Sequence, residues 1–133
     1  MHTIGLDVLL LERADHPGYW QSVTGSLEAD ETLGGAAMRE LHEETGIQEG
    51  KLRDWQMESE YEIYPEWRHR YAPGVTRNLE HVFGFTVNER VPVRLSPREH
   101  LNYIWLPYRE AALKVFSSSN ASAIMKLPEM LNK

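Results

Sequence analysis

The sequence predicts an α/β fold, an α/β/α sandwich in which a mixed sheet lies between helices. Two observations lead to this prediction: helical and strand patterns alternate along the chain, and some strand patterns also follow one another directly. The predicted strands cover residues 6–13, 19–24, 51–64, 80–87 and 103–106, and the predicted helices cover residues 33–45, 107–115 and 117–131. Because 133 residues are enough for one domain with a core and too few for two, we expect a single domain over residues 1–133.

The strand and helix patterns differ in how their apolar residues are spaced. Residues 6–13 form a short continuous apolar run that ends in charge, which is typical of a buried strand. In residues 51–64, aromatic and aliphatic residues alternate with glutamates, as in a half-buried strand. Ser117 offers N-cap chemistry to the last helix, and Pro128 weakens that helix.

Composition excludes several classes of function. A net charge of −6 argues against broad, sequence-independent binding to a nucleic-acid duplex, which needs many Lys and Arg side chains. The chain has no cysteine, so no disulfide, thiolate metal site or cysteine nucleophile is available. No apolar run approaches the ~20 residues of a membrane span, and Met1–Thr3 does not resemble the start of a signal peptide. We therefore expect a cytoplasmic protein with no membrane or stable nucleic-acid partner.

The helix at residues 33–45 has recognisable ends. Leu33, Ala37 and Leu41 recur at i, i+4 spacing and predict its apolar side. Thr32 is a plausible N-cap, and Gly46 stands where a C′ glycine ends a helix. Both signals support a helix between them.

Three glutamates gather on one side of this helix. Glu40, Glu43 and Glu44 fall within an arc of about 100°. Like charges at i, i+3 and i, i+4 destabilise a helix by roughly 0.2–0.5 kcal/mol per pair, so a neutralising partner is expected. One candidate is a hard divalent cation such as Mg²⁺, which binds through carboxylates and substrate phosphates. The alternative is a solvated acidic face in which Arg39 pairs with Glu43.

The wider stretch matches the pattern G-x5-E-x7-R-E-U-x-E-E-x-G-U, where U is a bulky apolar residue. The matching residues are Gly25, Glu31, Arg39, Glu40, Leu41, Glu43, Glu44, Gly46 and Ile47. This pattern resembles the signature of the Nudix hydrolases. The resemblance implies the Nudix fold and a Mg²⁺-dependent hydrolase, with Mn²⁺ as an alternative ion, acting on a nucleoside diphosphate linked to a further group.

The resemblance also implies roles for individual residues. By match to the motif, the metal ligands are Glu40, Glu43 and Glu44. In similar proteins a glutamate before the last strand reaches back to the metal, and Glu99 is the matching position, so it is a fourth ligand. Glu40 and Glu99 are the candidate general bases, and Arg39 pairs with Glu31 to fix the loop on the helix. We therefore expect Glu43→Gln to abolish turnover while leaving the fold intact.

The chain departs from the family in two places. Nudix folds usually have a strand before the one at residues 6–13, and only Met1–Gly5 remain for it, so we expect the first strand to be missing or shortened. Many Nudix proteins have Pro-Gly-Gly where this chain has Val23–Gly25, a difference that puts Thr24 at the mouth of the site. Gly25 and Gly46 are expected at backbone positions where a side chain would interfere.

Two further segments resemble one bacterial subgroup of the family. Trp20–Ser26 and His69–Asn78 are similar to the dihydroneopterin triphosphate pyrophosphatases, a group also labelled dATP or nucleoside triphosphate pyrophosphohydrolases. The likeness runs from Leu9 to about Ile124. It implies cleavage of dihydroneopterin triphosphate to the monophosphate and pyrophosphate in folate biosynthesis, with activity on dATP and other nucleoside triphosphates as well.

Three other functions stay open at this point. One is a house-cleaning dATP or nucleoside triphosphate pyrophosphohydrolase with the same site and a different ring pocket. Another is a Nudix-like ligand sensor without catalysis, against which the intact glutamates argue. A third is a structural acidic domain that binds Ca²⁺ incidentally. In each case we expect a monomer or a weak homodimer.

Six residues are candidate contacts to a substrate: Arg13, Thr24, Tyr61, Arg70, Arg77 and Ser117. Arg13 either binds phosphate or is a surface cation at the end of its strand. Arg70 and Arg77 belong to a basic stretch that is either a flap facing the polyphosphate or an ordinary hairpin loop. Tyr61 either stacks on the ring or packs in the core. Ser117 either contacts substrate or caps the last helix, and we favour the cap.

Overall fold

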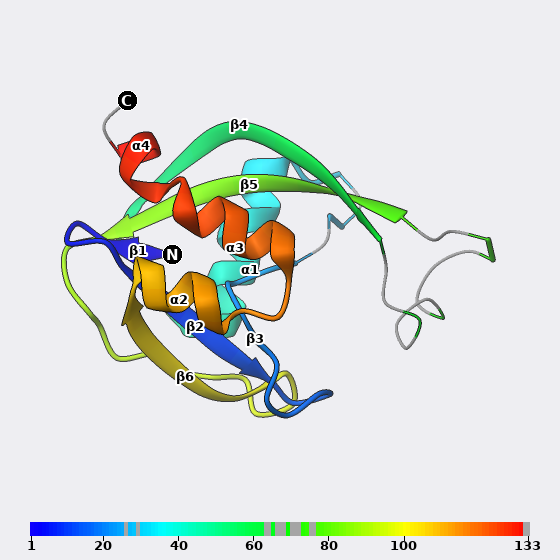
Figure 1. The fold of residues 1–133 in the computed structure, drawn as a ribbon, viewed down its shortest axis with the longest axis horizontal. Helices are drawn as coiled ribbons and strands as arrows, with labels where there is room; N and C mark the ends of the chain where they lie inside the picture. Colours follow the sequence, from blue (N-terminus) through cyan, green and yellow to red (C-terminus); the bar gives the residue numbers. More distant parts are fainter. Residues whose placement is uncertain are drawn as a thin grey trace.

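A computed structural model describes residues 1–25, 27–28, 30–62, 65, 69, 73–74 and 77–131 (Figure 1). The strands are β1 (His2–Thr3), β2 (Asp7–Arg13), β3 (Trp20–Gln21), β4 (Lys51–Glu62), β5 (Arg77–Val87) and β6 (His100–Pro107). The helices are α1 (Leu33–Thr45), α2 (Tyr108–Lys114), α3 (Ser118–Met125) and α4 (Leu127–Leu131). Among the described residues, no helix is both long and apolar enough to span a membrane.

The strands form one mixed sheet, as predicted. Along one path the strand order is β3-β2-β1-β5-β4, and β6 pairs with β2. Strand β1 runs antiparallel to β2 and parallel to β5, and β4 is antiparallel to β5. The β2–β6 ladder is antiparallel and extends from Asp7 opposite Pro107 to Arg13 opposite His100.

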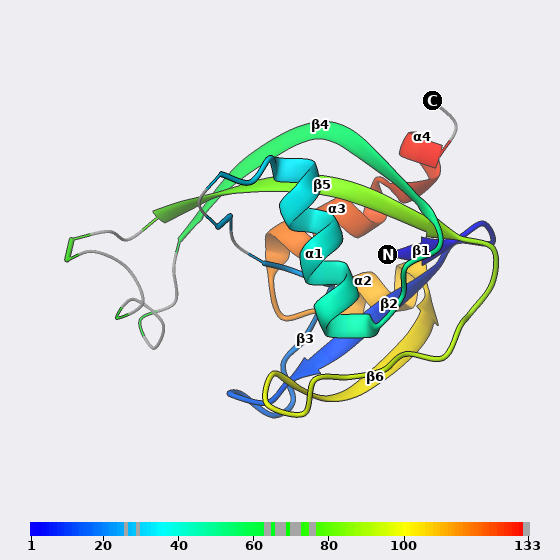
Figure 2. The same cartoon turned by 180° about the vertical axis from the view of Figure 1, so that it is seen from behind.

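Helices cover both faces of this sheet, which confirms the predicted α/β/α sandwich. Helix α1 lies over one face, and α2, α3 and α4 lie over the other (Figures 1 and 2). Strand β2 is buried on both sides, since Leu9 packs in the cluster that contains Leu41 of α1, whereas Leu10 packs in the cluster that contains Ala111 of α2. Its uninterrupted apolar run reflects this double burial.

The first strand is shortened, as expected. Only His2 and Thr3 form β1, and both are buried between β2 and β5. This two-residue strand joins the two halves of the sheet near the end of β5, where His2 lies opposite Thr86 and Thr3 opposite Val87.

Two helix predictions need correction. Leu33, the first residue of α1, is 42% exposed and contributes little to the core. The single helix expected at residues 117–131 is two helices, which break at Lys126. Pro128 explains the break, since it has no N–H and its ring clashes with the carbonyl four residues earlier.

Strands β5 and β6 begin earlier than predicted. β5 starts at Arg77 rather than residue 80, and β6 starts at His100 rather than residue 103. The early start of β6 pairs His100 with Arg13, the last residue of β2. Glu99 and His100 therefore lie at the end of the β2–β6 ladder.

Candidate metal centre and active site

The ends of α1 are fixed as the sequence predicts. The hydroxyl of Thr32 accepts a hydrogen bond of 3.0 Å from the backbone N–H of Gly35, and Gly46 has φ +73° while its N–H donates to the carbonyl of His42. A left-handed residue at this position favours glycine. These caps set the register that places Glu40, Glu43 and Glu44 in the second half of the helix.

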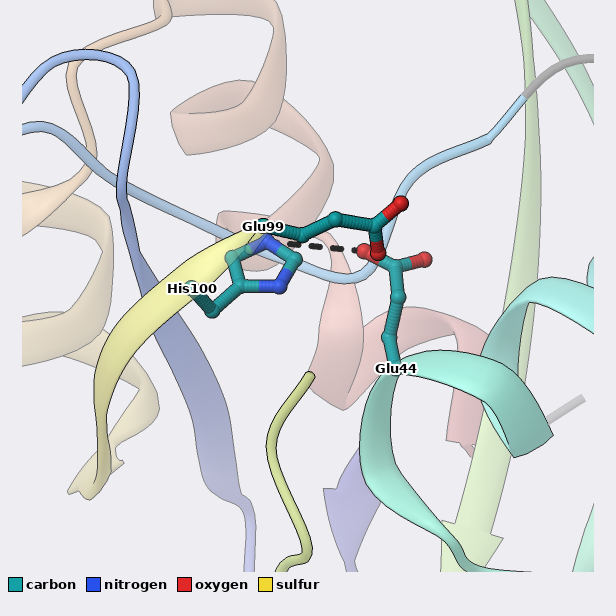
Figure 3. Close-up of side chains that lie close together, drawn as sticks. All are labelled: Glu44, Glu99 and His100. Atoms are coloured by element: carbon teal, nitrogen blue, oxygen red, sulfur yellow. Dashed lines mark ion pairs between the residues drawn. The ribbon is translucent and has the colours of Figure 1, made fainter. Parts of the chain in front are cut away.

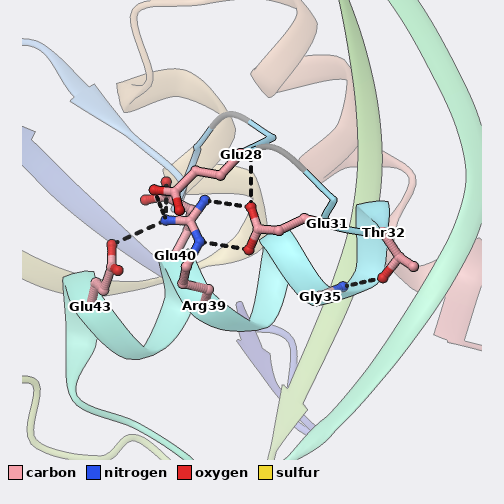
Figure 4. Close-up of polar contacts among 7 residues, drawn as sticks. All are labelled: Glu28, Glu31, Thr32, Gly35, Arg39, Glu40 and Glu43. Carbon is pink, nitrogen blue, oxygen red and sulfur yellow. Dashed lines mark hydrogen bonds and ion pairs between the residues drawn. The ribbon is translucent and has the colours of Figure 1, made fainter.

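The guanidinium group of Arg39 lies within hydrogen-bond or ion-pair distance of four carboxylates (Figure 4). Its Nε and Nη2 donate to the two carboxylate oxygens of Glu31, at 2.7 and 3.0 Å. Its Nη1 lies 3.0 Å from Glu40, 3.3 Å from Glu43 and 3.4 Å from Glu28. The bond to Glu31 is the main cause that raises the pKa of Arg39. Arg39 thus supplies part of the neutralisation for which the sequence suggested a metal.

The loop before α1 closes directly onto Glu40. A Cβ atom on Gly25 would overlap Cγ and Cδ of the Glu40 side chain. Glycine is therefore needed at this position for space. The same contact, together with the Arg39–Glu31 pair, fastens the loop to the helix.

Glu44 stands apart from its two neighbours. Its side chain is buried, with the residue 3% exposed, and its Oε2 has no hydrogen-bond partner among the described residues. Burial, followed by the charges of Glu40 and Glu99, raises the pKa of Glu44 to about 9. An ionised carboxylate here needs a nearby cation.

Glu99 and His100 complete this cluster (Figure 3). Glu99 is exposed in the turn before β6, and in Figure 3 its carboxylate points toward that of Glu44. One ligand atom each from Glu44, Glu99 and His100 lies within 4.8 Å of the others. The Nε2 of His100 is 3.5 Å from Oε1 of Glu44. Burial, and then the charge of Arg13, lowers the pKa of His100, so its imidazole is neutral at pH 7.

The donor set suits a divalent metal ion. Carboxylate oxygens dominate it, and the orphaned Oε2 of Glu44 is a buried acceptor that a cation would satisfy. The structure brings Glu44 together with Glu99, and Glu40 lies near enough to raise the pKa of Glu44. Neither Glu40 nor Glu43 belongs to the group of three, although the charge of each raises the pKa of Glu44, and the side chain of Glu43 is 54% exposed and paired with Arg39.

His100 was missed by the sequence analysis. It is 4% exposed, and its Nδ1 has no partner among the described residues. In the sequence, only its position directly after Glu99 could have pointed to His100. Its approach to Glu44 depends on the pairing of β6 with β2, which the sequence does not show.

Two candidate substrate contacts lie beside the cluster and are joined to each other. Arg13 donates to both carboxylate oxygens of Asp15, at 2.7 Å each, and to the side chain of Gln21 at 2.9 Å. Gln21 in turn donates to the hydroxyl of Thr24 at 3.4 Å. Arg13 pairs with His100 across the β2–β6 ladder. The linked side chains of Arg13, Gln21 and Thr24 therefore border the candidate metal centre.

The structure describes the other candidate substrate contacts only in part. Ser117 caps α3, where its hydroxyl accepts from the N–H of Asn120 at 3.4 Å, in line with the favoured interpretation. Tyr61 is the last residue but one of β4 and Arg77 begins β5, but their side chains lie outside the described part of the structure. Arg70 lies entirely outside the described residues.

Comparison with known proteins gives one consistent family. A NUDIX domain family model matches residues 3–127. The chain is 46% identical over 121 residues to the dihydroneopterin triphosphate diphosphatase of Escherichia coli K12, over 88% of this chain and 79% of that protein. It is 43% identical over 124 residues to the enzyme of the same name from Haemophilus influenzae, over 90% and 77%. The solved structure of the E. coli dihydroneopterin triphosphate pyrophosphohydrolase matches with a TM-score of 0.87 and 44% identity, over 92% of this chain and 86% of that chain. The chain therefore belongs to the NUDIX domain family, whose members include the Nudix hydrolases.

Proposed function

We propose that this chain is a metal-dependent pyrophosphohydrolase that converts dihydroneopterin triphosphate to its monophosphate and pyrophosphate. The observation that carries the chemistry is the buried Glu44, whose Oε2 has no hydrogen-bond partner among the described residues and whose carboxylate lies beside that of Glu99 and near Glu40. Support for the substrate comes from the relatives, since two proteins at 43–46% identity carry this activity in their names.

Mg²⁺, with Mn²⁺ as an alternative, is the ion we propose for the site. Glu40, Glu44 and Glu99 would hold it, and Glu43 would join them as the motif implies. When bound, such an ion neutralises charge on the phosphates and makes a water molecule more acidic.

The protein's own side chains have separate tasks in this proposal. Arg39 and Glu31 hold the loop on α1, so that Glu40 keeps its position under Gly25. Glu40 and Glu99 are the two candidate general bases, of which Glu40 is engaged by Arg39 and Glu99 is exposed toward substrate.

Hydrolysis takes place between the α and β phosphates in this proposal. The water oxygen bonds to phosphorus, the bridging P–O bond breaks, and the base accepts the proton of the water. In this proposal Arg13 and Thr24, which are joined through Gln21, contact the phosphates, and Arg13 exchanges its bonds to Asp15 for bonds to phosphate oxygens. A cytoplasmic location and a monomer or weak homodimer remain predictions.

A panel of substrates tests this proposal. Product release with Mg²⁺ should be measured on dihydroneopterin triphosphate, dATP, other nucleoside triphosphates and ADP-ribose, with orthophosphate detected in the presence and absence of inorganic pyrophosphatase. We expect a signal that requires pyrophosphatase and is strongest on the pterin. Signal spread evenly over deoxynucleotides would instead identify a house-cleaning enzyme. Metal binding without turnover on any compound would identify a sensor.

A further inference from the structure

Strand β6 carries a bulge beside the proposed metal site. From Asp7 to Glu12 the β2–β6 pairing is regular, and its continuation would place Leu101 opposite Arg13. Instead His100 lies opposite Arg13, so β6 has one extra residue at this point. Bulges of this kind change the direction in which nearby side chains point, and they are common next to active sites.

The bulge turns His100 to the face of the sheet that α1 covers. Successive side chains on a regular strand point to opposite faces, so His100 would share the face of Ile104, which packs against the cluster that contains Ala111 of α2. It lies instead beside Glu44 of α1 and opposite Arg13. The local irregularity therefore brings an imidazole to the carboxylate at the centre of the proposed metal site.

The backbone around His100 is fixed on both sides. The N–H groups of Glu99 and His100 both donate to the carbonyl of Ser96, at 3.0 and 2.9 Å, and the carbonyl of Glu99 accepts from the N–H of Ala14 at 2.9 Å. His100 is also buried. The fold therefore holds the imidazole in place beside Glu44.

No hydrogen bond among the described residues explains this position of the imidazole. Its Nδ1 has no partner, and its Nε2 lies 3.5 Å from Oε1 of Glu44. This separation exceeds the roughly 2.7–3.2 Å of an N–H···O bond. It lies between the separations of adjacent and opposite ligands on one ion, which are about 3.0 and 4.2 Å for metal–ligand distances near 2.1 Å. Glu99 is exposed, so its carboxylate can adjust to complete the group of three, whose ligand atoms lie within 4.8 Å of one another.

We propose that His100 is a nitrogen ligand for first-row transition-metal ions such as Mn²⁺ and Co²⁺, and that it makes the site prefer them to Mg²⁺. This inference rests on the metal dependence in the proposed function and adds a ligand that the carboxylate motif does not contain. Imidazole is a common ligand of transition-metal ions, whereas Mg²⁺ takes oxygen ligands and loses its water reluctantly. With Mg²⁺, His100 acts only by orienting Glu44, and with Mn²⁺ or Co²⁺ it also binds the ion.

Calorimetric titration of Mg²⁺ and Co²⁺ into the wild type and His100→Leu tests this inference through a ratio of affinities. Loss of an orienting group weakens both ions alike, by about 10-fold, whereas loss of a nitrogen ligand weakens Co²⁺ further. We expect the affinity for Co²⁺ to fall about 100-fold and that for Mg²⁺ about 10-fold, so the Co²⁺/Mg²⁺ ratio falls about 10-fold. An unchanged ratio would overturn the role of His100 as a ligand.

His100→Gln separates the two roles of the side chain. Its N–H lies near the position of Nε2 and should restore part of the affinity for Mg²⁺. An amide binds an ion through its oxygen, so the Co²⁺/Mg²⁺ ratio should stay as low as in His100→Leu. A ratio restored to the wild-type value would contradict the inference. His42→Gln, an exposed change on α1, is the matched control and should keep both wild-type affinities.

Pulsed electron paramagnetic resonance gives a readout that needs neither a substrate nor a substituted protein. With less than one equivalent of Mn²⁺, the wild type should show modulation from a directly bound ¹⁴N nucleus. The signal should disappear in His100→Gln and remain in His42→Gln. Its absence from the wild type would overturn the inference, even if the substituted proteins do not fold.

Failure of this inference can be told from failure of the proposed function. If the wild type hydrolyses dihydroneopterin triphosphate but shows no ¹⁴N signal, the function stands and the role of His100 falls. If the ¹⁴N signal and the change in ratio are both found but no triphosphate is hydrolysed, His100 is a metal ligand and the proposed function falls.

Discussion

The carboxylates on and just before α1 occupy two different environments. On one side Glu31, Glu40 and Glu43 surround Arg39, which lies within 3.3 Å of each of them. On the other side Glu44 is buried with an unpartnered oxygen, and the basic side chain nearest to it among the described residues is the neutral imidazole of His100, 3.5 Å away. The charge of the first group is balanced in part by Arg39, which holds the loop, although Glu40 and Glu43 are also proposed metal ligands. The carboxylate of Glu44 has no such cation beside it, which makes it the centre of the proposed metal site.

Replacing Glu44 should have the largest effect. Outer-shell partners of a metal usually contribute 10- to 100-fold to affinity or activity, so we expect loss of a ligand in Glu44→Gln to lower kcat more than about 100-fold. The metal-free variant should melt at a higher temperature at pH 7 than the metal-free wild type, because it no longer buries a carboxyl group whose pKa is raised to about 9 and which must take up a proton on folding. Activity assays and thermal melts in EDTA measure both effects.

Glu43→Gln is the matched variant for that experiment. The motif predicts loss of turnover here too, but Glu43 is exposed and paired with Arg39. We therefore expect no rise in the melting temperature of the metal-free protein. A rise equal to that of Glu44→Gln would remove the distinction between the two groups.

Arg39→Lys probes the balanced group. Lysine keeps the positive charge but cannot donate two parallel bonds to Glu31. We expect kcat to fall about 10-fold, because the loop and Glu40 lose their fixed position, while the affinity for Mg²⁺ changes less. Wild-type kcat in this variant would show that the Arg39–Glu31 pair does not position the loop.

Gly25→Ala probes the contact between the loop and Glu40. The added Cβ would overlap the Glu40 side chain, and overpacking of this kind costs about 1–3 kcal/mol. We expect a lower free energy of unfolding in urea and a several-fold lower kcat. Gly5→Ala is the control, because its Cβ would meet only Thr3 at the ordinary distance of 3.8 Å.

His100 should have a moderate effect on metal affinity. It is placed to orient Glu44, with Nε2 3.5 Å from Oε1, so His100→Leu should weaken Mg²⁺ binding about 10-fold. His100→Gln offers an N–H near the position of Nε2 and should recover part of the affinity. Calorimetric titration of both variants measures this, and equal affinities in the wild type and the leucine variant would exclude the role.

The smallest effect concerns a second balanced group, on β4 and β5. His81 lies 2.7 Å from Asp54 and 3.2 Å from Glu58, and the hydrogen bond to Asp54 is the main cause that raises the pKa of His81. A raised folded-state pKa gives stability that is fully present below about pH 6.5 and is lost as pH rises through the folded-state value. The melting temperature of the wild type relative to His81→Gln should therefore fall between pH 6 and pH 8. A difference that stays constant with pH would exclude the protonated pair.

Local signals predicted much of this molecule. Thr32 and Gly46 mark the ends of α1 because caps depend on a few neighbouring residues. The apolar run of β2 was also recognisable, since burial on both faces leaves no polar position. The two-residue β1 was expected only as a shortened strand, because two residues are too short to show a period.

The parts that the sequence could not predict depend on packing between distant segments. Glu43 and Glu44 are neighbours in the motif, yet one is exposed and the other buried, because the turn before β6 approaches only one of them. The position of His100 beside the cluster follows from the β2–β6 register, which places it opposite Arg13 and could not be predicted from the sequence.

The most direct test of the account is a calorimetric titration of Mg²⁺ and Mn²⁺ into the metal-free wild-type protein and into Glu44→Gln, with thermal melts of the same samples. The account predicts that the wild type binds the ions saturably and that its melting temperature rises when metal is added, and it predicts neither effect for Glu44→Gln. Equal binding by the two proteins would contradict it, because the unbalanced carboxylate at Glu44 would then not be the centre of the metal site.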